Sequence, residues 1–173
     1  MIKRIVFIVL AAVMAFALVS CAPDFVIPKG TQVSCEKFSA VLPEGWFNYP
    51  YHDVYGDDKT QLMSDALLFC KGTAEEMRAD ECSLIIISCS DLNGGSVDMR
   101  DMYENTEDVT LTVNGMIWNG YLGTYGGVKN VVLERETRKC KWSIAGYMEA
   151  KNSSYTLDDE DFRMILASLT LNQ

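Results

Sequence analysis

A single histidine, His52, and the lack of any Cys-x-x-Cys pair set the first limits on function. Without a Cys-x-x-Cys pair, the sequence has no signature of a thioredoxin-type dithiol or of a zinc ribbon. A glycine-rich phosphate loop is also missing, because the glycines of residues 120–127 are spaced as in a hairpin and no Lys-Ser pair follows them. With no catalytic constellation and no cofactor motif, the sequence predicts a protein that is not an enzyme and binds no cofactor.

Positive charge is scarce relative to negative charge. Lys and Arg number 15, Asp and Glu number 24, and the formal net charge is −9. This excess of acid argues against a nucleic-acid partner and against adhesion to anionic lipid by charge, since both need basic surfaces. It is compatible with cationic partners or divalent ions. Internal repeats and low-complexity tracts are also missing from the sequence.

Long apolar runs are missing too, apart from one at the N-terminus. Residues 5–19 contain no charged or strongly polar residue and follow Lys3 and Arg4. As a helix this run would span about 22 Å, which is less than the ~30 Å hydrocarbon core of a bilayer. The length is typical of the h-region of a secretory signal and is too short for a permanent membrane span.

The apolar run closes on Leu18-Val19-Ser20-Cys21, which resembles the lipobox of bacterial lipoproteins. The resemblance implies transfer of diacylglycerol to the Cys21 sulfur and cleavage before Cys21. Two acyl chains anchor a protein stably, at about 0.8 kcal/mol per buried methylene. We therefore expect residues 1–20 to be a lipoprotein signal peptide. The alternatives are an ordinary signal peptide with a coincidental cysteine and an uncleaved anchor helix.

The same resemblance predicts where the protein is located in the cell and how its domains are arranged. The protein is expected on the outer face of the bacterial cytoplasmic membrane, or in the outer membrane where the host has one. Residues 21–34 are predicted to be the lipidated N-terminus and a tether, because Pro23, Pro28 and Gly30 disfavour regular structure. Residues 35–173 are predicted to form a single domain, and loss of the signal would take the net charge from −9 to −11.

Five cysteines follow Cys21, so at least one thiol is left without an intramolecular partner. The exported side of a membrane permits disulfides, but sequence alone does not select the pairing. We favour Cys70–Cys82, because these two residues flank one polar connection between two apolar runs. The alternative is a set of reduced, buried thiols. The five residues are Cys35, Cys70, Cys82, Cys89 and Cys140.

Strand patterns dominate the rest of the chain. Residues 84–89 form a β-branched run typical of a buried strand, and residues 109–113 alternate apolar and polar side chains. Asn114-Gly115 is the strongest hairpin signal, since both residues tolerate positive φ. Pro43-Glu44-Gly45 is expected to turn the first strand back onto the second. Strands are predicted over residues 37–42, 46–51, 66–71, 84–89, 109–113, 116–122, 130–136 and 140–148.

Two helices are predicted beside these strands. Met99, Met102 and Tyr103 recur at helical spacing after Ser96, which is a suitable cap. The C-terminal helix has an apolar face over residues 162–169, with Thr156 or Asp158 as its cap and the acids of residues 158–161 at its positive dipole end. Together these elements predict an α+β fold, in which an antiparallel sheet of about 6–8 strands has helices packed on it.

Three short phrases resemble the PsbP/Mog1-like lipoproteins and exported proteins of bacteria. They are Phe-Ser-Ala-Val-Leu-Pro-Glu-Gly-Trp at residues 38–46, Val-Asn-Gly at 113–115, and Asp-Glu-Asp-Phe at 159–162 followed by Ile-Leu-Ala-Ser-Leu at 165–169. The resemblance covers most of residues 36–171. It implies a three-layer α/β/α sandwich around an antiparallel sheet. Its members, which include an extrinsic photosystem subunit and a small-GTPase partner, act as binding or accessory proteins.

Polar loops offer weak candidates for chemistry. His52 beside Asp53 is either a base or ligand, or part of a solvated loop, and we favour the loop because no nucleophile motif accompanies it. Asp53, Asp57 and Asp58 form an acidic cluster of the same weak kind. Residues 91–98 resemble a calcium loop, but Met102 stands where an EF-hand needs a bidentate acid. A turn followed by a helix cap is the simpler interpretation of that segment.

The aromatic residues admit two interpretations. Trp46, Trp118 and Trp142, together with the tyrosines, either line a groove for a glycan or peptide or pack in the core, and we favour the core. The leading functional hypothesis is a non-enzymatic binding or accessory lipoprotein, held to the membrane through Cys21, with a protein partner in the envelope and no nucleic acid. The alternatives are an extracytoplasmic redox protein or enzyme that uses an unpaired cysteine, and a structural envelope subunit that associates through a sheet edge.

Overall fold

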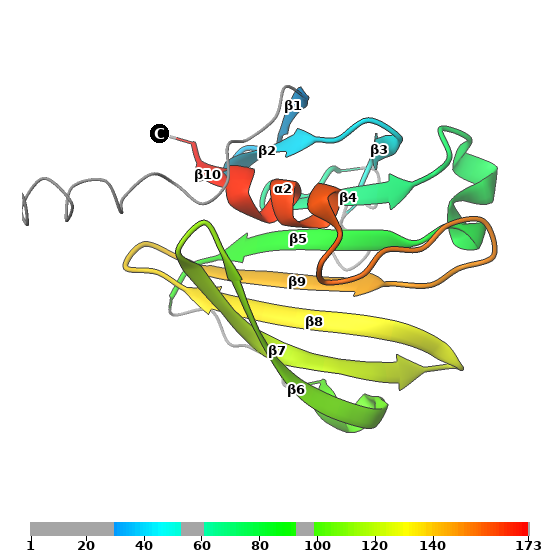
Figure 1. Cartoon of the computed structure of the whole chain (residues 1–173). Helices are drawn as coiled ribbons and strands as arrows, with labels where there is room; N and C mark the ends of the chain where they lie inside the picture. Colours follow the sequence, from blue (N-terminus) through cyan, green and yellow to red (C-terminus); the bar gives the residue numbers. More distant parts are fainter. Residues whose placement is uncertain (1–29, 53–60, 93–98, 173) are drawn as a thin grey trace, which may run out of the picture.

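The computed structural model describes residues 30–52, 61–92 and 99–172, and it consists mainly of antiparallel β-sheet (Figure 1). Ten strands form two sheets, and the described residues contain one α-helix, α2 (Glu160–Ser168). No helix in this part of the chain is both long enough and apolar enough to cross a membrane. Cys21 and the predicted signal peptide lie outside the described residues.

The strands divide into a small sheet and a large one. The small sheet has the order β1-β2-β10, and the large sheet has the order β3-β4-β5-β9-β8-β7-β6. The small sheet contains β1 (Thr31–Ser34), β2 (Phe38–Leu42) and β10 (Thr170–Leu171). The large sheet contains β3 (Trp46–Tyr49), β4 (Ala66–Lys71), β5 (Leu84–Ser90), β6 (Glu104–Val113), β7 (Met116–Tyr125), β8 (Val128–Glu136) and β9 (Lys141–Tyr147).

The expectation of a mainly antiparallel sheet is confirmed, and each predicted strand has a counterpart. The hairpin at Asn114-Gly115 is also confirmed: it joins β6 to β7, and both residues have positive φ, 50° and 72°. These values suit the tight turn that matches the twist of the flanking strands. Gly126 and Gly127, with φ of 58° and 80°, make the equivalent turn between β7 and β8.

Two predictions need correction, one about strand pairing and one about where the domain begins. β2 and β3 do not form a hairpin with each other, because β2 pairs with β1 and β10 whereas β3 pairs with β4. The turn at residues 43–45 therefore carries the chain from one sheet to the other. The predicted tether over residues 21–34 also ends too late. Residues 31–34 form β1, whose backbone pairs with β2 from Thr31 opposite Leu42 to Ser34 opposite Ser39.

The prediction of two helices packed on the sheet is not confirmed. The segment around Met99 and Met102 forms only a short 3-10 helix, Arg100–Met102, before β6 begins at Glu104. Met99 and Met102 are exposed, so they do not form an apolar face that packs on the sheet. Ser96, the predicted cap, lies outside the described residues. A second 3-10 helix, Glu76–Glu81, lies in the connection between β4 and β5.

The core lies on the inner face of the large sheet, where α2 and the small sheet gather (Figure 1). Phe162, Ile165 and Leu166 of α2 are fully buried, and Phe162 stacks on Tyr155 with ring centroids 5.1 Å apart. The large sheet curls back toward the helix at its far edge. There the Arg163 guanidinium donates a hydrogen bond to the Thr112 carbonyl of β6, at 2.8 Å.

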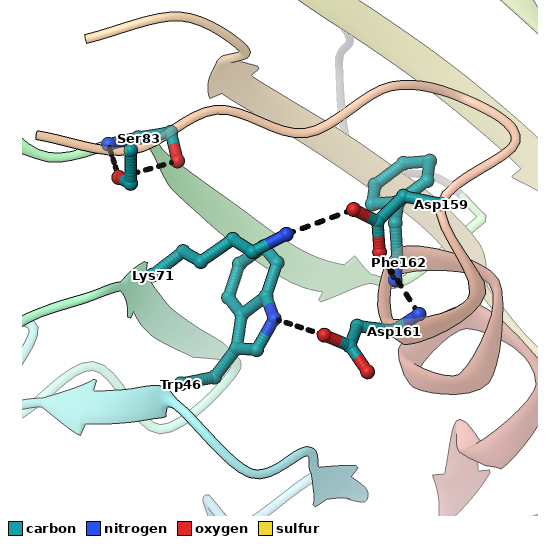
Figure 2. Close-up of polar contacts among 7 residues, drawn as sticks. Trp46, Lys71, Ser83, Asp159, Asp161 and Phe162 are labelled. Atoms are coloured by element: carbon teal, nitrogen blue, oxygen red, sulfur yellow. Dashed lines mark hydrogen bonds and ion pairs between the residues drawn. The ribbon is translucent and has the colours of Figure 1, made fainter.

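The N-terminus of α2 is fastened to the large sheet by polar contacts (Figure 2). Asp159 is the cap, since its side chain accepts from the amides of Asp161 and Phe162, so the predicted caps Thr156 and Asp158 are wrong. The second oxygen of Asp159 accepts from the Lys71 ammonium at 2.8 Å. Trp46 donates through Nε1 to Asp161 at 3.4 Å. Strands β3 and β4 therefore fix where the helix begins.

Replacing Asp159 by alanine is expected to destabilise the domain by about 2 kcal/mol. The substitution removes the cap of α2 and leaves the half-buried Lys71 ammonium without its carboxylate. Urea denaturation followed by circular dichroism measures the loss. Asp158→Ala is the matched control, because the Asp158 side chain is 97% exposed, and its effect should be near zero. Equal effects of the two variants would contradict the assignment of the cap.

Candidate functional site

The polar residues singled out from the sequence do not assemble into a site within the described residues. His52 is exposed and forms an isolated β-bridge with Leu62. Asp53, Asp57 and Asp58 lie outside the described residues, as do residues 93–98 of the predicted calcium loop. Asp91, at the start of that loop, pairs with Lys37 at 3.3 Å. In the part of the chain that the structure describes, no group of three or more His, Cys, Asp or Glu side chains is placed to hold a metal ion.

The tryptophans belong to the core, as favoured from the sequence. Trp46, Trp118 and Trp142 are each at most 3% exposed. Phe38 meets Trp142 edge to face at 5.0 Å, which fastens the small sheet to the large one. These side chains are therefore not available to line a groove for a ligand.

The tyrosines behave differently, because four of them gather on the outer face of the large sheet. We call this group the tyrosine face: Tyr103, Tyr121, Tyr125 and Tyr147. Tyr125 and Tyr147 are 48% and 41% exposed, whereas Tyr121 is buried beneath its neighbours. The ring centroid of Tyr103 lies 5.5 Å from that of Tyr121 and 5.9 Å from that of Tyr125.

Strand register explains why these side chains share one face. Tyr121 and Tyr125 are separated by an even number of residues along β7, so they point to the same side of the sheet. Tyr147 of β9 lies opposite Asn130 of β8, and Asn130 lies opposite Gly123 of β7, so these three residues form one row across the sheet. An apolar row runs beside it, in which Leu68, Ile86, Ala145, Val132 and Tyr121 lie opposite one another in turn.

Gly123 makes room for the centre of the tyrosine face. A Cβ atom added to Gly123 would lie 2.9 Å from the Tyr103 Cβ and 3.3 Å from the Thr106 methyl group. The missing side chain therefore allows Tyr103 to lie directly over the sheet. Burial raises the pKa of the Tyr103 hydroxyl, and the neighbouring Tyr147 and Tyr125 raise it further. Tyr103 consequently stays neutral and serves as an apolar ring with a polar tip.

An arginine of the chain is already held at the rim of the tyrosine face. The Arg100 guanidinium lies 5.1 Å from the ring centroid of Tyr121, and it pairs with the Asp108 carboxylate at 2.6 Å. The aromatic ring attracts the guanidinium through its quadrupole, and the neighbouring carboxylate attracts it through its opposite charge. The acids Asp101, Glu104 and Glu107 of the same segment are also exposed.

The five described cysteines form a second group of interest. All five are free thiols in the structure; Cys70, Cys82, Cys89 and Cys140 are buried, whereas Cys35 is half-buried. Burial raises the pKa of Cys70 to about 11, with a smaller contribution from Cys82. Burial also raises the pKa of Cys89 to about 12, and a hydrogen bond with Cys140 adds to the shift. At neutral pH these two thiols are protonated and are poor nucleophiles.

From the sequence, the tyrosines and tryptophans were interpreted as either a groove lining or core residues, with the core favoured, so the grouping of these four tyrosines on one face was not predicted. Its only local signal is the alternation of Tyr121, Gly123 and Tyr125 along β7. Periodicity shows that these residues share a face, but it does not show whether that face looks toward the core or away from it. Tyr103 and Tyr147 join the group only through the register of β6 to β9.

Comparison with known proteins adds little about function. No protein-family model matches the sequence, and no curated protein is significantly similar to it. A crystal structure of a protein from Bacteroides thetaiotaomicron resembles this chain with a TM-score of 0.48 and 15% sequence identity. The likeness covers 84% of this chain and 50% of that one, so this chain spans half the length of that protein.

Proposed function

We propose that this protein is a non-enzymatic lipoprotein, anchored through Cys21, that binds a protein partner of the bacterial envelope with its tyrosine face. The exposure of Tyr125 and Tyr147 on the outer face of the large sheet carries the proposal. Tyrosine supplies a large contact area with little loss of conformational entropy, and it is enriched at binding hot spots. Adjoining apolar side chains such as Ile86 and Val132 are half-exposed and extend the surface.

The chemistry of this surface favours a partner segment that carries arginine or lysine. Within the chain, the Arg100 guanidinium lies over the Tyr121 ring and against Asp108, which supports a cationic side chain as the group that a partner would place here. The exposed rings of Tyr125 and Tyr147 offer further cation–π contacts, and the acidic net charge, −9 for the full sequence and −11 without the signal peptide, attracts positive charge. A negatively charged partner would meet repulsion from the same surface.

The two alternative functions have less support. A redox enzyme needs an activated thiol. Burial raises the pKa of the Cys70 and Cys89 thiols, which leaves the half-buried Cys35 as the cysteine that such an enzyme would have to use. Among the described residues, self-association through a sheet edge could use β3 or β6 of the large sheet or β1 or β10 of the small sheet. β6 carries exposed Glu104, Glu107 and Asp108 and an irregular register between Glu104 and Glu107, and both features oppose pairing with a second copy.

The PsbP/Mog1-like resemblance supports the same proposal. Its named members act as binding or accessory proteins, and the antiparallel sheet with a C-terminal helix is compatible with the fold that the resemblance implies. We propose this relationship on the three sequence phrases alone. A second helical layer, which an α/β/α sandwich requires, is not present among the described residues.

Replacing both Tyr125 and Tyr147 by serine is expected to weaken binding of a synthetic arginine-rich peptide about tenfold. Each exposed cation–π contact contributes about 0.5–1 kcal/mol, and 1.4 kcal/mol corresponds to a factor of ten. Isothermal titration calorimetry on the full chain in detergent measures the affinity. Because tyrosine and serine are both neutral, the loss reports the rings and not the net charge.

Leu62→Ser is the matched control for the double variant. Leu62 is 56% exposed and lies next to His52, away from the tyrosine face. This variant should bind the peptide as the unaltered chain does. Equal affinities of all three proteins would show that the peptide is held by net charge alone and would overturn the proposed site.

A further inference from the structure

Four of the five cysteines form two pairs with the same cross-strand geometry. In the first pair, Cys70 of β4 lies opposite Leu84 of β5, and Cys82 comes two residues before Leu84. The hydrogen bond from the Lys71 amide to the Ser83 carbonyl, at 2.9 Å, continues the pairing of the two chains past Leu84. Residues two apart along a strand share a face, so the two cysteines are diagonal neighbours on the outer face.

The second pair repeats this arrangement on the inner face. Cys89 of β5 lies opposite Trp142 of β9, and Cys140 comes two residues before Trp142. Cys140 lies close enough to Cys89 to raise the pKa of the Cys89 thiol. Both residues belong to the hydrophobic core, where they are 1% and 4% exposed.

The fifth cysteine stands apart from these pairs. Cys35 follows β1, is half-buried, and donates its S–H to the Phe38 carbonyl at 3.6 Å. It lines a hollow together with Tyr49, Tyr51 and Met63, so reagents have access to it. Cys35 also lies close enough to Cys89 for the two groups to interact electrostatically.

We propose that the exported protein carries two cross-strand disulfides, Cys70–Cys82 and Cys89–Cys140, and that Cys35 keeps a free thiol beside the second bridge. Diagonal neighbours on adjacent strands lie about 7–8 Å apart, whereas a disulfide needs Cα atoms about 4.4–6.8 Å apart. Each bridge therefore requires a small shift of Cys82 or Cys140, which lie just before β5 and β9 and outside the regular strands. The two bridges would join three consecutive strands of the large sheet, because one ties β4 to the chain entering β5 and the other ties β5 to the chain entering β9.

The oxidation balances with a disulfide as the oxidant. Each bridge forms when two thiols lose two protons and two electrons, and a protein disulfide or a small-molecule disulfide takes up the electrons and becomes two thiols. A thiolate must attack first. Because burial raises the pKa of Cys70 and Cys89, the folded chain holds almost no thiolate at these positions. The bridges therefore form while the chain folds, before the cysteines are buried.

Peptide mapping of the exported full chain tests the proposal. The membrane fraction is acidified at once, the protein is alkylated before and after denaturation with two different reagents, and unreduced peptides are identified by mass spectrometry. Trypsin alone leaves Cys82 and Cys89 on one peptide, so chymotrypsin, which cuts after Leu84, must separate them. We expect Cys70 linked to Cys82 and Cys89 linked to Cys140, with Cys35 alkylated in the folded protein.

Either of two results would overturn the proposal: alkylation of all five thiols, or a bridge that includes Cys35. Cys35→Ser is the control, and it should keep both bridges. Cys140→Ser should lose one bridge and keep Cys70–Cys82, while Cys82→Ser should lose one and keep Cys89–Cys140. The map of the unaltered chain decides the question even if a variant fails to fold, since it requires no substitution.

Discussion

Replacing Cys21 by serine is expected to abolish lipid labelling of this protein completely. The proposed anchor is a thioether to the Cys21 sulfur, and a serine hydroxyl does not replace it. Two acyl chains hold a protein at a membrane stably at about 0.8 kcal/mol per buried methylene, so their loss removes the whole anchoring free energy. Growth with radiolabelled palmitate, followed by electrophoresis of the membrane fraction, measures the incorporation.

Lipid labelling must be read separately from membrane attachment. An uncleaved precursor would keep the apolar run of residues 5–19 and remain in the membrane fraction without lipid. Its larger mass distinguishes it from the processed form. Cys35→Ser, which alters another cysteine near the N-terminus of the domain, should keep full labelling. Undiminished labelling of the Cys21→Ser chain would refute the anchor.

Replacing Phe162 by alanine is expected to destabilise the domain by about 3–5 kcal/mol. Phe162 is fully buried between α2 and the large sheet, and its ring stacks on Tyr155. Truncation removes buried apolar area, leaves a cavity that the sheet cannot close, and breaks an aromatic contact. A typical domain has only about 5–15 kcal/mol of total stability, so this loss is a large fraction of it. Urea denaturation measures the change.

Two other substitutions show whether the loss comes from the cavity. Phe162→Leu keeps most of the apolar volume and should cost clearly less than alanine. Met102→Ala removes an apolar side chain that is 55% exposed, and its effect should lie within about 0.5 kcal/mol of zero. A small effect of Phe162→Ala would mean that α2 contributes little to the core.

The strands were predictable because their signals are local. Alternation at residues 109–113 and the β-branched run at residues 84–89 follow from the period of two that any strand imposes. Asn114-Gly115 fixes a turn through the backbone preferences of two residues alone. The C-terminal helix was also evident, because Phe162, Ile165 and Leu166 share one face of a helix with a period of 3.6 residues.

Which strands pair with one another was not predictable in the same way. Pro43-Glu44-Gly45 turns the chain, but whether β2 and β3 then pair depends on β1 and β10, which compete for the edges of β2. The cap of α2 was misplaced for a related reason. Several acids precede the helix, and Asp159 is favoured because Lys71 of β4 reaches it. The segment of Met99 and Met102 has helical spacing but no core to cover, so it stays a 3-10 helix.

The sequence by itself determined the expected lipid attachment at Cys21, the acidic character, most strands and the last helix, since each depends on neighbouring residues or on total composition. Only the tertiary structure decided which side of the large sheet faces the core, and hence that Tyr125 and Tyr147 are exposed while the tryptophans are buried. The physical reason is strand register. Alternation sorts side chains into two faces, but contacts between strands far apart in sequence decide which face α2 covers.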